Sequence, residues 1–151
     1  MALIKFRSIG IIFTAWLLFS AQSSLAIDNP DAPDITATFN TQSAKYETAI
    51  QNAPDQSEID KAYAKYNEFL DHALNQNYTA LSKQLKPESK QALIRSQRAW
   101  LQFRDAEAAF IADNWSTENF GSSSALSRNA YRAEIIKQRI LELLDYLKNY
   151  Q

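Results

Sequence analysis

The chain of 151 residues contains no cysteine, carries 16 basic and 17 acidic residues, and has a formal net charge of −1. The lack of cysteine excludes disulfide-stapled scaffolds, thiol catalysis and thiolate metal sites. The near balance of charge is unlike the basic face that a nucleic-acid-binding protein normally presents.

The first 26 residues have the pattern of a cleavable signal peptide. Two basic residues, Lys5 and Arg7, precede an apolar run over 9–21, and small residues stand three and one positions before a cut after Ala26. The run is shorter than the roughly 20 residues of a membrane-spanning helix. We therefore expect a periplasmic or secreted protein with no membrane anchor after cleavage; the alternative is an uncleaved N-terminal anchor.

The mature chain, 27–151, is long enough for one domain with an apolar core. Without the two basic residues of the leader it has 14 basic against 17 acidic residues, a formal net charge of −3. A charge of this sign favours encounter with a cationic partner through long-range attraction, which salt weakens.

The composition of the mature chain favours helices. Gly121 is its only glycine, whereas a domain with many tight β-turns needs more positions with positive φ. Residues 27–35 are rich in proline and aspartate, so we expect an extended leader there and a helical domain over 36–151.

Apolar residues recur at three- and four-residue steps in four segments, as in amphipathic helices. The first predicted helix covers 36–52. The second follows a break at 52–58 and ends near Lys86, the third runs from 87 to 113 or 115, and the fourth covers 125–149. Ser57 and Asp60 resemble a capping box, and Pro87 suits the first position of a helix. Because short connections favour antiparallel neighbours, the predicted fold is all-α, an antiparallel bundle of three long helices plus a shorter N-terminal one. The residues expected in the core are Phe39, Tyr46, Ile50, Ile59, Tyr63, Tyr66, Leu70, Ala73, Tyr78, Leu81, Leu85, Trp100, Phe103, Phe110, Ala133, Ile136, Ile140, Leu143, Leu144, Leu147 and Tyr150.

An arginine stands in the apolar stripe of the third predicted helix, where Arg104 shares a face with Trp100. A buried guanidinium without a partner would cost several kcal/mol, so a carboxylate partner is required. The candidates are Glu107 and, on the last helix, Glu134 and Glu142. We expect Arg104 to reach the last helix and fix the register of the two helices; the alternative is that Arg104 is presented to a ligand.

The sequence indicates no catalytic residue, no metal site and no cofactor. Asp105 and Glu107 are two residues apart on a helix and point away from each other, so they cannot flank one glycosidic bond. His72 is the only histidine and stands beside Asp71 without a nucleophile motif. A solvated surface histidine is the simpler interpretation, and the protein is predicted not to be an enzyme.

The segment 114–127 is polar and contains the only glycine of the mature chain, so we expect a loop. It also keeps two aromatic residues, and exposed aromatics beside serine and glycine suit a protein-binding surface. For Trp115 core packing is favoured over exposure, and for Phe120 the two interpretations are equally open. The candidate partner-binding residues are Trp115, Phe120, Gly121, Ser122, Ser123 and Ser124.

Two motifs in the second half of the chain are similar to those of a known family. Residues 96–110 read SQRAWLQFRDAEAAF, a Gly-Ser-Ser segment begins at Gly121, and residues 131–143 read YRAEIIKQRILEL. Over about 55–147 the chain resembles the N-terminal domain of LprI-type lysozyme inhibitors, which are small exported bacterial helical domains. The matching positions are Gln97, Arg98, Trp100, Phe103, Arg104 and Asp105 in the first motif, and Ile135, Arg139, Glu142 and Leu143 in the second. The resemblance implies a structural signature formed by Gln97, Trp100, Arg104, Asp105, Glu107, Arg139 and Glu142.

The chain departs from that family at its cysteine pair. Ala108 stands where the family has its first cysteine, and Tyr131, or Ala130 if the alignment slips by one residue, stands near the second. The resemblance implies a disulfide there, which this chain lacks. The departure leaves the predicted fold intact and bears only on how rigidly the intervening segment is held.

These observations lead to one functional hypothesis and two alternatives. We expect an exported, non-enzymatic binding protein that inhibits a lysozyme or another peptidoglycan-cleaving enzyme, with the segment 114–127 entering or capping the partner's glycan cleft. The alternatives are an immunity protein against a cell-wall-degrading toxin, and a periplasmic structural or envelope-stress module.

The leader pattern gives a first prediction. Expression in a bacterial host should yield a periplasmic protein that begins at Ile27, because only Ala26 completes the small-residue pattern after the apolar run. Intact mass spectrometry of the periplasmic fraction measures the N-terminus. A protein that retains Met1 would contradict cleavage.

Overall fold

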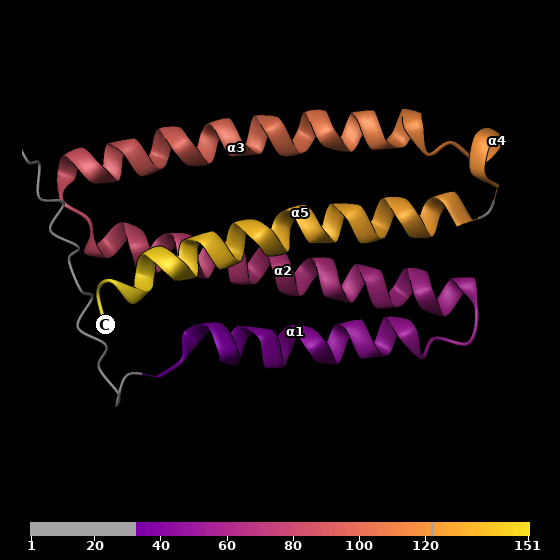
Figure 1. Cartoon of the computed structure of the whole chain (residues 1–151), viewed down its shortest axis with the longest axis horizontal. Coiled ribbons are helices and arrows are strands. Elements are labelled where there is room, and N and C mark those ends of the chain that lie inside the picture. The colour runs from indigo at the N-terminus through magenta and orange to yellow at the C-terminus, as the bar shows by residue number, and fades with distance from the viewer. Residues whose placement is uncertain (1–32, 122) are drawn as a thin grey trace, which may run out of the picture.

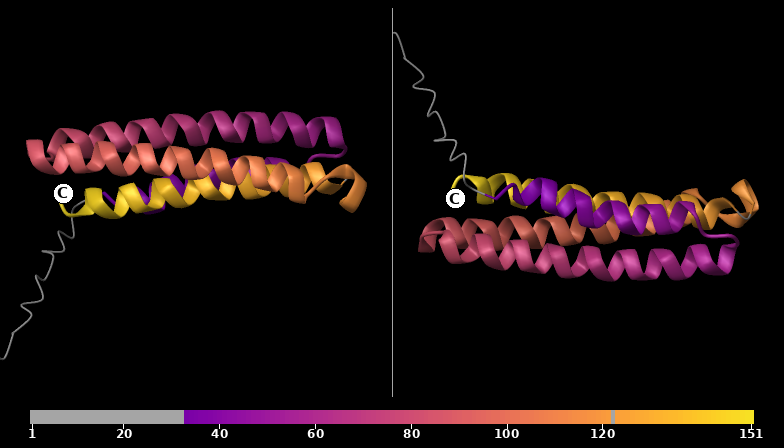
Figure 2. Two further views of the ribbon diagram at one scale, coloured as in Figure 1. Left: turned by 90° about the horizontal axis from the view of Figure 1, so that it is seen from above. Right: turned by 90° about the horizontal axis from the view of Figure 1, so that it is seen from below.

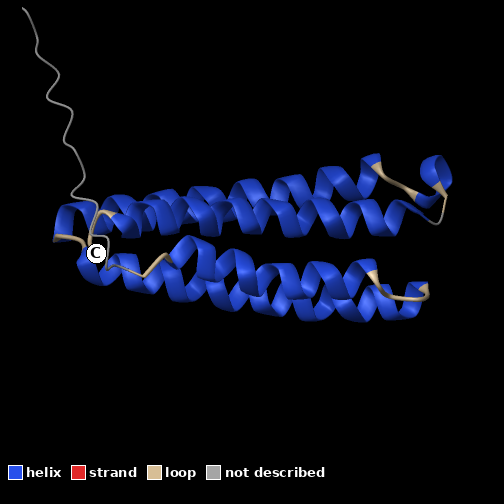
Figure 3. Cartoon of the chain, turned by 60° about the horizontal axis from the view of Figure 1, so that its bottom comes forward, coloured by secondary structure: helices blue, strands red, loops and turns tan. Residues whose placement is uncertain are grey.

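The computed structural model describes residues 33–121 and 123–151 (Figures 1 and 3). Its helices are α1 (Ile35–Gln51), α2 (Gln56–Gln84), α3 (Pro87–Asn114), α4 (Thr117–Phe120) and α5 (Ser123–Lys148). The predicted all-α bundle of three long helices and a shorter N-terminal one is confirmed, and α4 is an additional single turn. Within the described ranges, none of the helices combines the length and apolarity needed to span a membrane. The expected signal peptide and residues 27–32 of the expected leader lie outside the described residues.

Short acidic side chains set the starts of the first two helices. The carboxylate of Asp34 accepts a hydrogen bond from the backbone N–H of Ala37 at 2.8 Å, and that of Asp55 accepts one from Glu58 at 3.0 Å. The capping box predicted at Ser57 is therefore wrong. The break before α2 supplies Asp55, which satisfies a free N–H group of the first turn before Ser57 is reached.

The bundle is organised around α2 and α5. These two helices make the most extensive contact, and they run in the same direction because α3 reverses the chain between them (Figure 1). Helices α1 and α3 lie on opposite sides of this pair, as the views from above and below also show (Figure 2). Chain neighbours are thus antiparallel, as expected, whereas the central pair is parallel.

The core follows the helical periodicity of the sequence. Leu70 of α2 and Ile140 and Leu143 of α5 are completely buried at the centre. Helix α1 packs onto α2 through stacked aromatic rings, with the ring centroids of Tyr46 and Phe69 4.7 Å apart. Tyr150 is exposed rather than in the core, because α5 ends at Lys148 and the chain beyond it only turns. The expected burial of Phe103 and Phe110 is also wrong: both are exposed, because α3 turns the face that carries Leu93 and Ile111 toward the bundle.

Helix α3 is attached to this core by few buried side chains. Only Leu93 and Ile111 are buried among its 28 residues, whereas eight of the 26 residues of α5 are buried. Its main contacts are with α5. Polar links must therefore contribute a large share of what positions α3, and these links form the candidate site.

Candidate functional site

The segment between α3 and α5 folds into an ordered turn, so the loop predicted over 114–127 is wrong. Ser116 caps the short helix α4 by accepting a hydrogen bond from the N–H of Asn119 at 3.2 Å. Gly121 then adopts a φ of 65°, a conformation that side chains disfavour, and α5 starts at Ser123. Residues 115–121 with 123 and 124, called the tip below, lie at one end of the bundle (Figure 1).

The six predicted partner-binding residues differ in how far they are exposed to solvent. Phe120 is 52% exposed and Gly121 and Ser123 are exposed, so they are accessible to a partner. Trp115 is partly buried and packs edge-to-face against Tyr131, with ring centroids 5.5 Å apart. The other two predicted residues are Ser124, which is only 1% exposed, and Ser122, which lies outside the described residues.

Arg104 does not reach the last helix, and that expectation is wrong. Its Nε and one terminal nitrogen donate to Oδ1 of Asp105 at 3.0 and 2.8 Å. The guanidinium also lies 5.6 Å from the ring centroid of Trp100, in cation–π range. Because 32% of the Arg104 side chain is exposed, water and these local partners satisfy its charge.

The buried arginine of this domain is Arg139 on α5, which is 7% exposed. Its Nε donates to the side-chain oxygen of Gln97 at 3.0 Å, and one terminal nitrogen donates to the hydroxyl of Ser96 at 3.2 Å. The other terminal nitrogen donates to the carboxylate of Glu142 at 2.7 Å. Three members of the signature, Gln97, Arg139 and Glu142, thus meet between α3 and α5.

Three of the remaining signature residues form a separate group on α3, and Glu107 belongs to neither group. Trp100, Arg104 and Asp105 contact one another on α3. Glu107 is partly buried, and no side-chain hydrogen bond joins it to either group in the described part of the chain. The signature residues therefore form two separate groups: a clamp between α3 and α5 at Arg139, and a local cluster on α3 at Arg104.

Two further arginines of α5 hold the C-terminal half of α3. Arg132 donates to the backbone oxygen of Ala108 at 3.4 Å, and Arg128 donates to the backbone oxygen of Trp115. Ala108 is where the family resemblance places the first half of a disulfide. In this chain, hydrogen bonds to main-chain oxygens connect the same two helices at that level.

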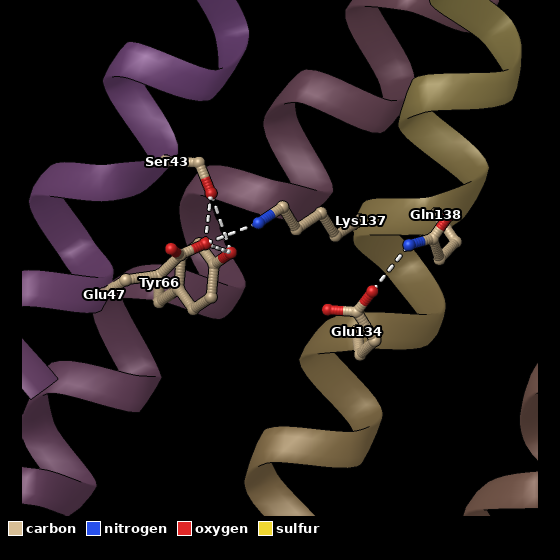
Figure 4. Close-up of polar contacts among 6 residues, drawn as sticks. All are labelled: Ser43, Glu47, Tyr66, Glu134, Lys137 and Gln138. Atoms are coloured by element: carbon tan, nitrogen blue, oxygen red, sulfur yellow. Dashed lines mark hydrogen bonds and ion pairs between the residues drawn. The ribbon is translucent and has the colours of Figure 1, made fainter.

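Sequence reasoning missed a polar cluster that joins α1, α2 and α5 (Figure 4). The hydroxyls of Ser43 and Tyr66 lie 2.8 Å apart, and each donates to Oε1 of Glu47 at 2.9 Å. Lys137 of α5 donates to the same oxygen at 2.7 Å. The spacing of Ser43 and Glu47, one helical turn apart on α1, was the only sequence signal for this contact.

The charge of Glu47 is stabilised by its partners on α2 and α5, so this cluster holds the three helices together. The hydrogen bond from Lys137 lowers the pKa of Glu47 below its ordinary value of 4.5, against an opposing effect of burial. Burial raises the pKa of the Tyr66 hydroxyl, so it stays protonated and donates. One carboxylate oxygen with three donors has little capacity left to act as a base. Among the described residues, no group of three or more histidine, cysteine or acidic side chains is placed to hold a metal ion.

The fold and these contacts define an all-helical bundle whose buried polar groups connect helices. Comparison with protein families gives the family itself: the model described as "Lysozyme inhibitor LprI" matches residues 47–143, and the chain belongs to this family. Comparison with curated proteins and with solved structures finds no significant match.

The two arginines give a paired stability prediction. Arg139→Ala should lower the free energy of unfolding by about 2 to 3 kcal/mol, because it leaves a gap and strips Gln97 and Ser96 of a buried donor. Arg139→Lys should recover little, since a point charge does not replace the planar fork. Arg104→Ala should cost less than about 1 kcal/mol, since its partner is exposed. Urea unfolding measures all three, and a larger loss for Arg104→Ala than for Arg139→Ala would contradict these assignments.

The clamp at Glu47 gives a pH prediction. Because the folded state lowers the pKa of Glu47, its contribution to stability is complete above the ordinary pKa and is lost as the pH falls through the folded value. Lys137→Met should therefore destabilise the protein near neutral pH by about 1 kcal/mol or less, since Glu47 is partly exposed. The difference from the wild type should shrink between about pH 5 and pH 3. Unfolding curves across this range test it, and a difference that does not change with pH would argue against the ion pair.

Proposed function

We propose that this member of the LprI family is a non-enzymatic binding protein that inhibits a lysozyme or another peptidoglycan-cleaving enzyme. The family match supports the class of target. The expected signal peptide supports a location outside the cytoplasm, where peptidoglycan is cleaved. The formal net charge of −3 for residues 27–151 favours encounter with a cationic target.

The proposed mechanism is occlusion by the tip. The observation that carries it is Phe120, a large apolar side chain that is 52% exposed at one end of the bundle. Gly121 and Ser123 beside it are exposed, and the Ser123 hydroxyl, which donates to the backbone oxygen of Phe120 at 3.0 Å, can still accept a hydrogen bond. Exposed aromatics are frequent hot spots of protein interfaces, and small polar neighbours can replace the hydrogen bonds that sugar makes in a glycan cleft.

The architecture supports a tip of fixed shape. The edge-to-face packing of Trp115 on Tyr131 and the hydrogen bond from Arg128 to Trp115 attach the tip to α5. A segment ordered before binding loses less conformational entropy when it docks. The tip therefore suits a rigid plug better than a segment that folds on binding.

The double variant Phe120→Ala with Ser123→Ala tests this mechanism. It should weaken inhibition at least tenfold, about 1.4 kcal/mol, and leave the melting temperature nearly unchanged, because both side chains are exposed. Ser124 is left intact because it is buried. Inhibition constants against a panel of lysozymes, and capture of hydrolases from an envelope extract, measure the effect.

The matched control is Tyr146→Ala, which removes an exposed aromatic from the far end of α5. It should inhibit as the wild type does. Full inhibition by the tip variant would refute occlusion by the tip, and loss of inhibition in the control alone would move the interface to the other end of the bundle. A wild-type protein that inhibits no lysozyme and captures no peptidoglycan hydrolase would refute the proposed function.

A further inference from the structure

Helix α3 lies at one edge of the bundle (Figure 1), and a stripe of uncharged residues along it is exposed to solvent. Six residues recur along it at alternating steps of four and three, the spacing of a coiled-coil seam. All six are exposed, and the two phenylalanines are 52% and 60% exposed. The stripe, called the outer seam below, consists of Ala92, Ser96, Ala99, Phe103, Ala106 and Phe110.

The order of large and small residues in the outer seam is self-complementary when two copies are antiparallel. A two-fold axis near residue 101 places Phe103 opposite Ala99 of the second copy, and Phe110 opposite Ala92. Each aromatic knob then meets a small residue that leaves room for it. Parallel pairing would instead place phenylalanine against phenylalanine and alanine against alanine, giving layers of unequal thickness.

The charges of α3 favour the same orientation. Its first half carries three basic residues and one acidic residue, and its second half carries three acidic residues and one basic residue. These are Glu88, Lys90, Arg95 and Arg98 in 87–100, and Arg104, Asp105, Glu107 and Asp113 in 101–114. Antiparallel pairing brings the basic half of one helix to the acidic half of the other, whereas parallel pairing brings like charges together.

A pocket lies beside the position that Phe110 of the second copy takes in this register. A pocket of about 340 Å³ opens between the ends of α2, α3 and α5, and its lining includes Ala92, Leu81, Leu85 and Leu93. The antiparallel register places Phe110 of the second copy opposite Ala92, which lines this pocket. The most exposed large apolar side chain of the described residues therefore lies beside a pocket whose lining is mainly apolar and also includes Ser96 and Arg139, and two-fold symmetry repeats the contact.

We propose that the protein forms a homodimer through antiparallel packing of α3 on α3, with Phe103 and Phe110 as the anchors. The outer seam runs for about 27 Å, because Ala92 and Phe110 are 18 helical steps of about 1.5 Å apart. The dimer carries its two tips at opposite ends. The proposal does not depend on the proposed function, because the outer seam and the exposed face of the tip use different side chains.

The first experiment is sedimentation velocity of the mature protein over a range of concentrations. The wild type should form a dimer, and Phe103→Glu and Phe110→Glu should each weaken it at least about thirtyfold, which corresponds to about 2 kcal/mol. Phe120→Glu is the matched control, because Phe120 is as exposed as Phe103 but lies off the seam. It should leave the dimer intact, and all three variants should keep the helical circular dichroism of the wild type.

The second experiment tests the orientation and uses the absence of native cysteine. In the antiparallel register Ser96 faces Ala106 of the second copy. The Ser96 hydroxyl also accepts a hydrogen bond from Arg139, so Ser96→Cys weakens that one contact of the clamp while its exposed position keeps the thiol accessible. Ser96→Cys and Ala106→Cys proteins, mixed and oxidised with oxidised glutathione, should give a cross-linked heterodimer, while each variant alone should give little covalent dimer.

Three outcomes would overturn the proposal. A wild type that stays monomeric at every concentration excludes the dimer, whatever the protein inhibits. Cross-linking of Ser96→Cys with itself indicates a parallel pair. Dimerisation that survives both Phe103→Glu and Phe110→Glu, or that is lost in Phe120→Glu, places the interface elsewhere.

Discussion

The contact between α2 and α5 is the constraint on which the rest of the fold depends. It contains Leu70, Ile140 and Leu143, all fully buried, and each buried aliphatic side chain of this size contributes about 1.5 to 3 kcal/mol. The two helices are parallel, so a helix must bring the chain back between them. Helix α3 is that return segment, and α1 covers the opposite side (Figure 1).

The attachment of α3 differs in kind from that of α1. Helix α1 packs on α2 through stacked rings, and Glu47 adds a polar clamp to α5. Helix α3 buries little and is held by three arginines of α5, which bond the side chains of Gln97 and Ser96 and two main-chain oxygens. Hydrogen bonds are directional, so they fix the register of α3 where apolar contact alone would not. They also provide a cross-connection that does not require the disulfide implied by the family resemblance.

The helices were predictable from the sequence because burial imposes a 3.6-residue period on Ile, Leu and aromatic residues, as in α5. The partners of polar side chains were not predictable in this way. Arg104 lies in an apolar stripe, but the adjacent Asp105 and the ring of Trp100 satisfy it locally. Arg139 lies between buried Ile136 and Leu143 and has an acidic residue three positions on, so the sequence does not tell these two arginines apart. The polar composition of the tip predicts a loop, whereas Ser116 caps a helical turn there.

Helix α3 has apolar residues on two faces, one toward the bundle and one toward solvent. A helix that is apolar on two faces is stable in water only when both faces are covered. The inner face uses Leu93 and Ile111 against the bundle, and nothing in the described chain covers Phe103 and Phe110. The inner contact is small, so the arginines of α5 contribute much of what holds α3 in place. The tip follows α3 directly, so the same helix carries the outer seam on its exposed side and Phe120 beyond its end, and the two surfaces use different side chains.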